Sequence, residues 1–133
     1  MPKNVIQILA LLVVCNVAQA SNWLSLGKSA NKNDEIFMDV SSIKFEQGVG
    51  RASFKTTRKH HTTQTDGKWW SFDLVKTAFN CAEEMYRDEA LNVYYEDGTS
   101  YSLPAEMYPR PWRPVAPDPG ADLEMTFICS VKN

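Results

Sequence analysis

Six of the seven prolines in this 133-residue chain fall between Pro104 and Pro119, and this run constrains the fold more than any other local feature. Proline lacks a backbone N–H and fixes φ, so it is excluded from helix interiors and central strands. We therefore expect residues 104–119 to cross the molecule as extended, partly polyproline-like chain, held in place by Tyr108 and Trp112.

A helix is predicted directly after this crossing. Asp118-Pro119 has the residue types of a helix N-cap and first helical position. The apolar residues that share one helical face are Leu123, Phe127, Ile128 and Val131. Cys129 falls on the last turn of this helix.

The chain before the prolines has the pattern of short strands separated by turns. Strands are predicted over residues 22–28, 36–40, 49–59, 69–79 and 99–103, with turn signals at Gln47-Gly48, Asp66-Gly67 and Asp97-Gly98. Residues 81–91 fit a helix or a strand. We favour a strand across most of 85–95, because it gives the Asp97-Gly98 hairpin a long partner. The predicted fold class is α+β: a twisted antiparallel sheet of about five to six strands with one C-terminal helix.

The strand over residues 69–79 has apolar residues on both faces, which predicts a central position. Trp70, Phe72, Leu74 and Ala78 are expected on one face, and Trp69, Val75 and Phe79 on the other. The tryptophan pair and the tyrosines nearby could instead line a ligand groove. We favour core packing, because such residues more often form cross-strand pairs.

Residues 1–20 have the features of a cleaved signal peptide. Lys3 is followed by an apolar run from Val5 to Val17 and by Ala18-Gln19-Ala20, a signal-peptidase pattern. Residues 21–133 are then a single domain in the periplasm or on the outer cell surface, with no transmembrane segment left after cleavage. Lipidation of Cys15 is the alternative: Leu12 suits a lipoprotein box, but Val14 is bulkier than the usual residue before the cysteine.

Export also bears on the two remaining cysteines. Cys81 and Cys129 form an even pair in an oxidising compartment, which predicts a disulfide between the 69–79 strand and the C-terminal helix. For a separation of this length the chain-entropy model gives a stabilisation of about 4 kcal/mol. Two free structural thiols are the alternative.

Charge excludes a nucleic-acid partner and leaves one local cluster. The formal net charge is −2, and loss of Lys3 makes it −3, so there is no global basic field. The basic cluster consists of Lys55, Arg58, Lys59, His60 and His61. It could attract sulfated glycans, anionic lipid or an acidic protein face, or it could simply be a solvated strand end.

No cofactor, metal or catalytic centre is expected. His60 and His61 are adjacent, so a strand would point them to opposite faces, and the chain has no third histidine. The sequence lacks a Gly-rich phosphate loop, a nucleophile elbow and zinc-ligand spacing.

Several residues spread along the chain resemble the surface-adhesin protein E family of Gram-negative bacteria: Trp23, the stretch Phe37-Met-Asp-Val-Ser-Ser-Ile43, Cys81, and Trp112-Arg-Pro-Val-Ala-Pro before Cys129. The resemblance implies an antiparallel sheet tied to a C-terminal helix by the disulfide. It also implies an extracytoplasmic protein, in some members a lipid-anchored one or a surface binder of host extracellular-matrix proteins. Asp39 and Ser42 are expected to shape a turn.

The expected function is a non-enzymatic exported binding module, in particular a surface adhesin with a matrix or other protein ligand. A periplasmic, envelope-associated protein without a host ligand is the alternative. Open sheet edges are compatible with a homodimer.

Overall fold

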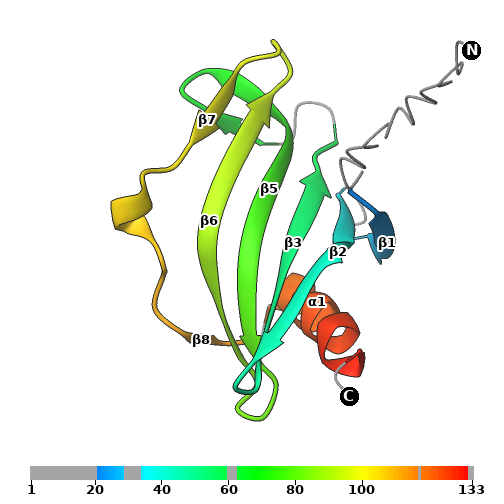
Figure 1. Cartoon of the computed structure of the whole chain (residues 1–133). Helices are drawn as coiled ribbons and strands as arrows, with labels where there is room; N and C mark the ends of the chain where they lie inside the picture. The colour runs from blue at the N-terminus through cyan, green and yellow to red at the C-terminus, as the bar shows by residue number, and fades with distance from the viewer. Residues whose placement is uncertain (1–20, 29–33, 60–62, 117, 132–133) are drawn as a thin grey trace, which may run out of the picture.

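One antiparallel sheet and one C-terminal helix make up the computed structural model, which describes residues 21–28, 34–59, 63–116 and 118–131 (Figure 1). The strands are β1 Trp23–Lys28, β2 Glu35–Glu46, β3 Val49–Thr57, β4 Gln64–Thr65, β5 Lys68–Asn80, β6 Met85–Tyr95, β7 Ser100–Ser102 and β8 Arg113–Pro114. The 3-10 helix η1 spans Ala105–Met107, and the α-helix α1 spans Pro119–Ser130. The strand order is β1-β2-β3-β5-β6-β7, with β4 paired to β5 and β8 paired to β6.

The eight strands correct the expectation of five or six, while the α+β class with a C-terminal helix is confirmed. Both strands off the main path are two residues long, too short to show an alternating pattern in the sequence. They exist only because the long strands β5 and β6 offer free hydrogen-bonding positions, as in the pairings of Gln64 with Trp69 and Arg113 with Tyr86. The expected signal peptide and Cys15 lie outside the described residues.

The predicted tight turns are present. Gln47 and Gly48 have φ values of 51° and 79°, and Asp66 and Gly67 have values of 51° and 75°. Two consecutive positive φ angles are typical of a type I′ turn, whose twist matches that of antiparallel strands. The segment that fitted either a helix or a strand forms β6 from Met85 onward, as favoured.

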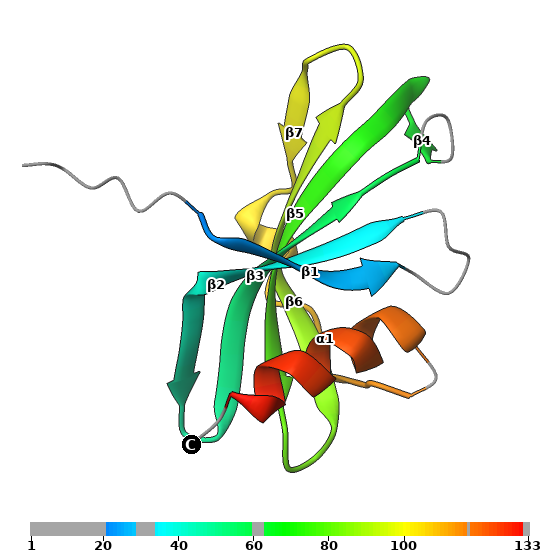
Figure 2. The ribbon, with the colours of Figure 1, turned by 90° about the vertical axis from the view of Figure 1, so that its right-hand side faces the viewer.

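Helix α1 covers part of one face of the sheet, which we call the inner face; the opposite side is the outer face. Figure 2 shows α1 crossing the lower half of the strands, while the ends of β5, β6 and β7 extend past it. The helix buries Ile128 completely in a core formed largely by inner-face residues. Val131, expected on the same helical face, lies just beyond the helix and is 46% exposed. The predicted Cys81–Cys129 disulfide is confirmed.

An irregularity in β5 changes the predicted side of Trp70. Trp70 pairs with Tyr95 and Phe72 pairs with Tyr94, so an extra residue interrupts the alternation between them. Trp70 consequently lies on the inner face beside Asp73, not on the face of Phe72. The prediction for Trp70 was therefore wrong. It assumed that side chains alternate without interruption along the strand, and a bulge cannot be recognised from that alternating pattern.

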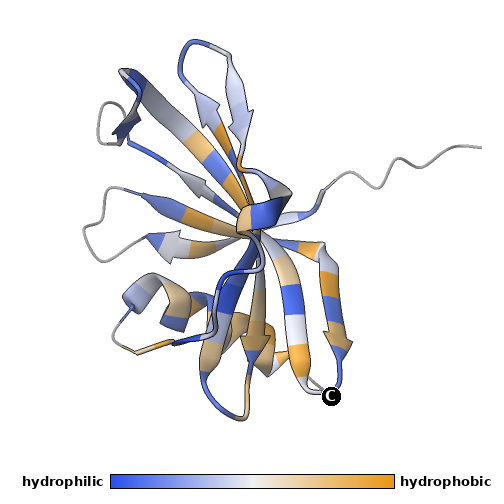
Figure 3. Cartoon of the chain, turned by 90° about the vertical axis from the view of Figure 1, so that its left-hand side faces the viewer, coloured by the Kyte–Doolittle hydropathy of each residue, from blue (hydrophilic) through white to orange (hydrophobic). Residues whose placement is uncertain are grey.

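The proline-rich segment crosses the molecule as predicted, interrupted by the single turn of η1 (Figure 3). Its backbone is attached to β6 by the Arg110 N–H, which donates to the Asp88 carbonyl at 2.9 Å. The Arg87 guanidinium lies 4.6 Å from the centre of the Trp112 ring, which holds this tryptophan against the sheet.

Candidate functional site

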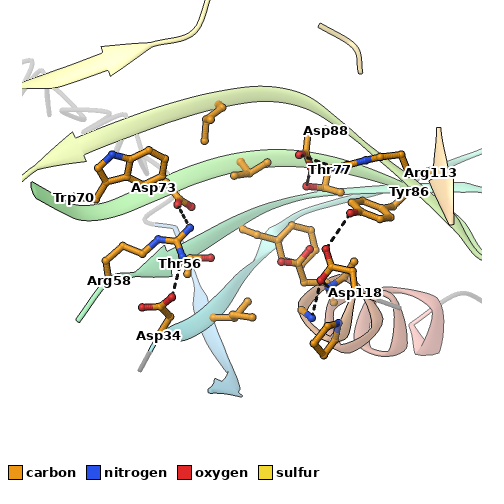
Figure 4. Close-up of a pocket in the computed structure, with 18 residues that line it drawn as sticks. Asp34, Thr56, Arg58, Trp70, Asp73, Thr77, Tyr86, Asp88, Arg113 and Asp118 are labelled. Carbon is orange, nitrogen blue, oxygen red and sulfur yellow. Dashed lines mark hydrogen bonds and ion pairs between the residues drawn. The ribbon is translucent and has the colours of Figure 1, made fainter. Parts of the chain in front are cut away.

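A cavity of about 610 Å³ opens on the inner face, between the start of α1 and strands β3, β5 and β6 (Figure 4). Its apolar lining includes Ile36, Phe54, Val75 and Leu91. Its polar groups gather at two ends, one around Arg58 and one around the first turns of α1. The volume lies within the range of roughly 300–1,000 Å³ usual for small-molecule sites.

At one end, Arg58 joins two carboxylates. Its Nη1 lies 2.9 Å from Asp34 Oδ2 and its Nη2 lies 2.7 Å from Asp73 Oδ2, with the Trp70 ring centre 5.5 Å from the guanidinium carbon. The Asp73 side chain is only 3% exposed. Burial raises the pKa of Asp73, and the Arg58 charge and hydrogen bond oppose that rise. The arginine therefore compensates carboxylates that are otherwise costly to bury.

At the other end, Asp118 connects α1 to the sheet. Its Oδ1 accepts hydrogen bonds from the backbone N–H groups of Gly120 at 3.0 Å and Ala121 at 3.1 Å, which confirms it as the N-cap. Its Oδ2 accepts a hydrogen bond from the Tyr86 hydroxyl at 3.1 Å. Burial, followed by the negative charge of Asp118, raises the pKa of Tyr86 to about 12.

Two further carboxyl groups face the cavity at this end. Asp88 accepts a hydrogen bond from the Thr77 hydroxyl at 3.2 Å and lies 3.7 Å from Arg113 Nη2. Burial is the main cause that raises the pKa of Asp88. Glu124 has a pKa well above its ordinary value, because surrounding protein desolvates the carboxyl and Asp88 and Asp118 add negative charge.

The structure separates the residues of the basic cluster. Lys55 and Arg58 are three residues apart in extended chain, so they lie on opposite faces. Lys55 is on the outer face, with Nζ 4.6 Å from the Phe72 ring centre, whereas Arg58 is paired with its two carboxylates in the cavity. The backbone N–H of Lys59 donates to Asp34 Oδ1 at 3.4 Å. His60 and His61 lie outside the described residues, and the binding role of the cluster stays a prediction.

The outer face instead brings together side chains that are distant in sequence. Phe72 stacks on Tyr94 with ring centres 4.4 Å apart, and Lys55 also lies 6.0 Å from the Trp23 ring centre. We call these four residues the outer-face group; all are half-buried. Their assembly depends on strand register, which places Phe72 beside Tyr94 and Lys55 beside Leu74.

Asp39 and Ser42 have a structural role, as predicted, but at an interruption within the continuous strand β2 and not in a turn between strands. Asp39 Oδ1 accepts hydrogen bonds from the Ser41 N–H at 3.0 Å and from the Asn22 N–H at 3.1 Å. The Ser42 hydroxyl donates to the Asp39 carbonyl at 2.7 Å and accepts from the Ser53 N–H at 2.8 Å. These bonds satisfy backbone groups where the β2–β3 register is interrupted, between Asp39 and Lys44.

The cavity was not predicted from the sequence. Its polar residues come from distant segments and form no motif. One signal was available: Asp73 stands within the apolar stretch Phe72-Asp-Leu-Val75, at an inward-facing position. A charged residue at such a position is rarely buried without a partner. Within the described residues, no three His, Cys, Asp or Glu side chains gather closely enough to hold a metal ion.

Comparisons with known proteins agree with this fold. The model of the surface-adhesin protein E family matches residues 23–130. The crystal form II structure of Haemophilus influenzae protein E is similar over 84% of this chain and 89% of that chain, with a TM-score of 0.54 and 12% sequence identity, which shows a shared fold. No curated protein is significantly similar in sequence. Across the described part of the chain, no helix has the length and apolar character needed to span a bilayer. Because the family match covers most of its length, the chain belongs to the surface-adhesin protein E family.

Proposed function

We propose that this chain is an exported, non-enzymatic binding module that acts as a surface adhesin for a matrix or other host protein. Membership of the surface-adhesin protein E family over residues 23–130 is the observation that carries the proposal. Residues 1–20 direct export and residues 21–133 form the single mature domain.

The outer-face group is the contact surface in this proposal. Trp23, Lys55, Phe72 and Tyr94 are half-buried, so they present aromatic area and one cation without a large cost in side-chain entropy. Tryptophan and tyrosine are enriched among residues that dominate binding energies. Lys59, His60 and His61 follow β3 in sequence, and the proposal assigns them supporting basic contacts. Arg58 contributes indirectly by anchoring the chain next to them through Asp34 and Asp73.

Protease shaving of intact cells tests the location. Cleavage of this chain while a periplasmic control protein survives supports surface display. Protection until the outer membrane is opened contradicts it and favours the periplasmic alternative.

Binding is then measured on immobilised basement-membrane extract with the purified mature domain. The double variant Lys55→Ala/Tyr94→Ala is expected to bind at least 10-fold more weakly. The control Tyr101→Ala removes a tyrosine that is 51% exposed on β7, outside the outer-face group, and is expected to bind like the unmodified domain. Equal loss in both variants, or in neither, contradicts the proposed surface.

We also propose a homodimer that pairs through the edge strand β1. In the described structure β1 pairs with β2 on one side only, and an unpaired edge is a template for a second strand. Light scattering coupled to size exclusion measures the mass directly, and a monomer at all concentrations contradicts this part of the proposal.

A further inference from the structure

The two ends of the inner-face cavity differ in charge balance. Five carboxyl groups and two guanidinium groups line it: Asp34, Asp73, Asp88, Asp118 and Glu124 against Arg58 and Arg113. Arg58 is held by two of the carboxylates at its own end. Arg113 lies 3.7 Å from Asp88 with its side chain 54% exposed, so solvent weakens its compensation of the helix end.

Glu124 is the carboxyl group at this end for which the described residues provide no partner. Among the described residues, its carboxyl makes no hydrogen bond and no ion pair, whereas Asp118 is used by the helix amides and Tyr86. Glu124 is half-buried and lines the cavity, so part of its surface stays accessible there. A partly buried carboxylate is stabilised when a cation or donor reaches it, and among the described residues no positive group does so for Glu124.

The spacing of the carboxyl groups indicates what kind of cation fits. No trio of acidic side chains in the described residues approaches closely enough to ligate one metal ion. The walls of the same cavity carry apolar side chains, including Phe54, Val75 and Leu91. A cation on an alkyl stem uses both features, since the methylenes cover apolar surface while the charge meets the carboxyl groups.

We propose that the inner-face cavity binds an organic cation, an alkylammonium or alkylguanidinium group, with Glu124 as its counter-ion and Asp88 and Asp118 in support. The cation belongs to a free amine or to a lysine or arginine side chain of a partner protein. The site is separate from the outer-face group, so its test does not depend on the proposed adhesion.

In the first experiment the ¹⁵N-labelled mature domain is titrated separately with hexylammonium, hexanol and hexanoate. Binding is measured from the changes in amide chemical shifts. Hexylammonium is expected to shift the amides of Thr77, Leu91 and Ala121 and to bind at least 10-fold more tightly than hexanol, with hexanoate weakest. Similar affinity for all three probes overturns the proposal, because the cavity would then recognise only the alkyl chain.

A variant pair tests the counter-ion. Glu124→Gln is expected to reduce the affinity for hexylammonium to that for hexanol. The control Asp122→Asn removes the same charge from an exposed position of the same helix, and its affinity is expected to stay within twofold of that of the unmodified domain. Unchanged binding by Glu124→Gln overturns the assignment.

A second readout needs no substitution. The side-chain carboxyl ¹³C signal of Glu124 is titrated with pH in the absence and presence of saturating hexylammonium. A bound cation is expected to lower the midpoint by about one pH unit or more, against a background of Asp73, Asp88, Asp118 and Arg113 that is the same in both titrations. An unchanged midpoint overturns the proposal even if Glu124→Gln fails to fold.

N-acetyl-lysine methylamide distinguishes the two sources of the cation. If it shifts the same amides as hexylammonium with comparable affinity, the site accepts a protein side chain. If only hexylammonium binds, the site takes a free amine. If neither binds, the proposal fails.

Discussion

Arg58 Nη2 lies 2.7 Å from Asp73 Oδ2, and this ion pair closes the inner-face cavity at the end opposite α1 (Figure 4). The pair joins the residue after β3 to the middle of β5, while Asp34 binds the same guanidinium from the residue before β2. These three charged side chains are buried or half-buried, and they connect β2, β3 and β5 at one point.

Substitution of Arg58 by methionine is expected to lower the free energy of unfolding by about 2–4 kcal/mol. The variant keeps the apolar stem but leaves Asp73, 3% exposed, without its cation. Urea unfolding measures the change. Arg51→Met is the control, because the Arg51–Glu89 pair is 38% and 26% exposed and is expected to cost less than about 1 kcal/mol. Equal losses in the two variants contradict the structural role of Arg58.

Glu124→Gln is expected to be more stable than the unmodified domain at neutral pH. The folded-state pKa of Glu124 is raised, so the folded state holds this proton more tightly than the unfolded state does. The resulting stability is fully present below the unfolded pKa of about 4.3 and is lost as pH rises through the folded pKa, at about 1.4 kcal/mol per pKa unit.

Urea unfolding at pH 4 and pH 8 checks this sign. The advantage of Glu124→Gln is expected to be large at pH 8 and to vanish near pH 4. Asp122→Asn, which removes one carboxylate from an exposed position of α1, is the control for loss of a charge. A difference that is the same at both pH values argues against a raised pKa.

Removal of the disulfide by Cys81→Ser and Cys129→Ser together is expected to lower the free energy of unfolding by about 4 kcal/mol. The bridge closes a loop with a sequence separation of 48 and fastens α1 to the turn between β5 and β6. Thermal unfolding of the double variant, compared with the unmodified domain in a thiol reductant, measures the effect. Both should unfold at similar temperatures, below that of the unmodified domain without reductant. A midpoint equal to that of the unmodified domain without reductant, in either sample, would contradict the prediction.

Asp118→Asn separates capping from charge. Asparagine caps helices as well as aspartate does, so stability is expected to change by less than about 1 kcal/mol. The pKa of Tyr86 should fall from about 12 towards 10, because the negative charge beside its hydroxyl is gone. Burial still raises this pKa in the variant, so the fall is partial. The ¹³C signal of the Tyr86 ring, followed at alkaline pH, reports the midpoint. If the midpoint stays where it is in the unmodified domain, burial alone sets this pKa.

The sequence by itself determined the features whose physics is local. Gly48 and Gly67 accept positive φ, Asp118 satisfies the first amides of α1, and the proline run cannot enter a helix or a central strand. The cysteine pair and the family resemblance, both confirmed, also follow from residues whose identity alone is informative.

Only the tertiary structure decided the cavity and the fate of the basic cluster. Strand register places Arg58 beside Asp73 and leaves Lys55 on the other face. The bulge after Trp70 turns that tryptophan to the inner face, and the short strands β4 and β8 form by pairing with the long strands β5 and β6. A shift of one residue in pairing moves a side chain to the opposite face, and that shift is set by packing between distant segments. For this reason the sequence could not predict the partners of Asp88 and Asp118. Nor could it predict that Glu124 has no partner among the described residues.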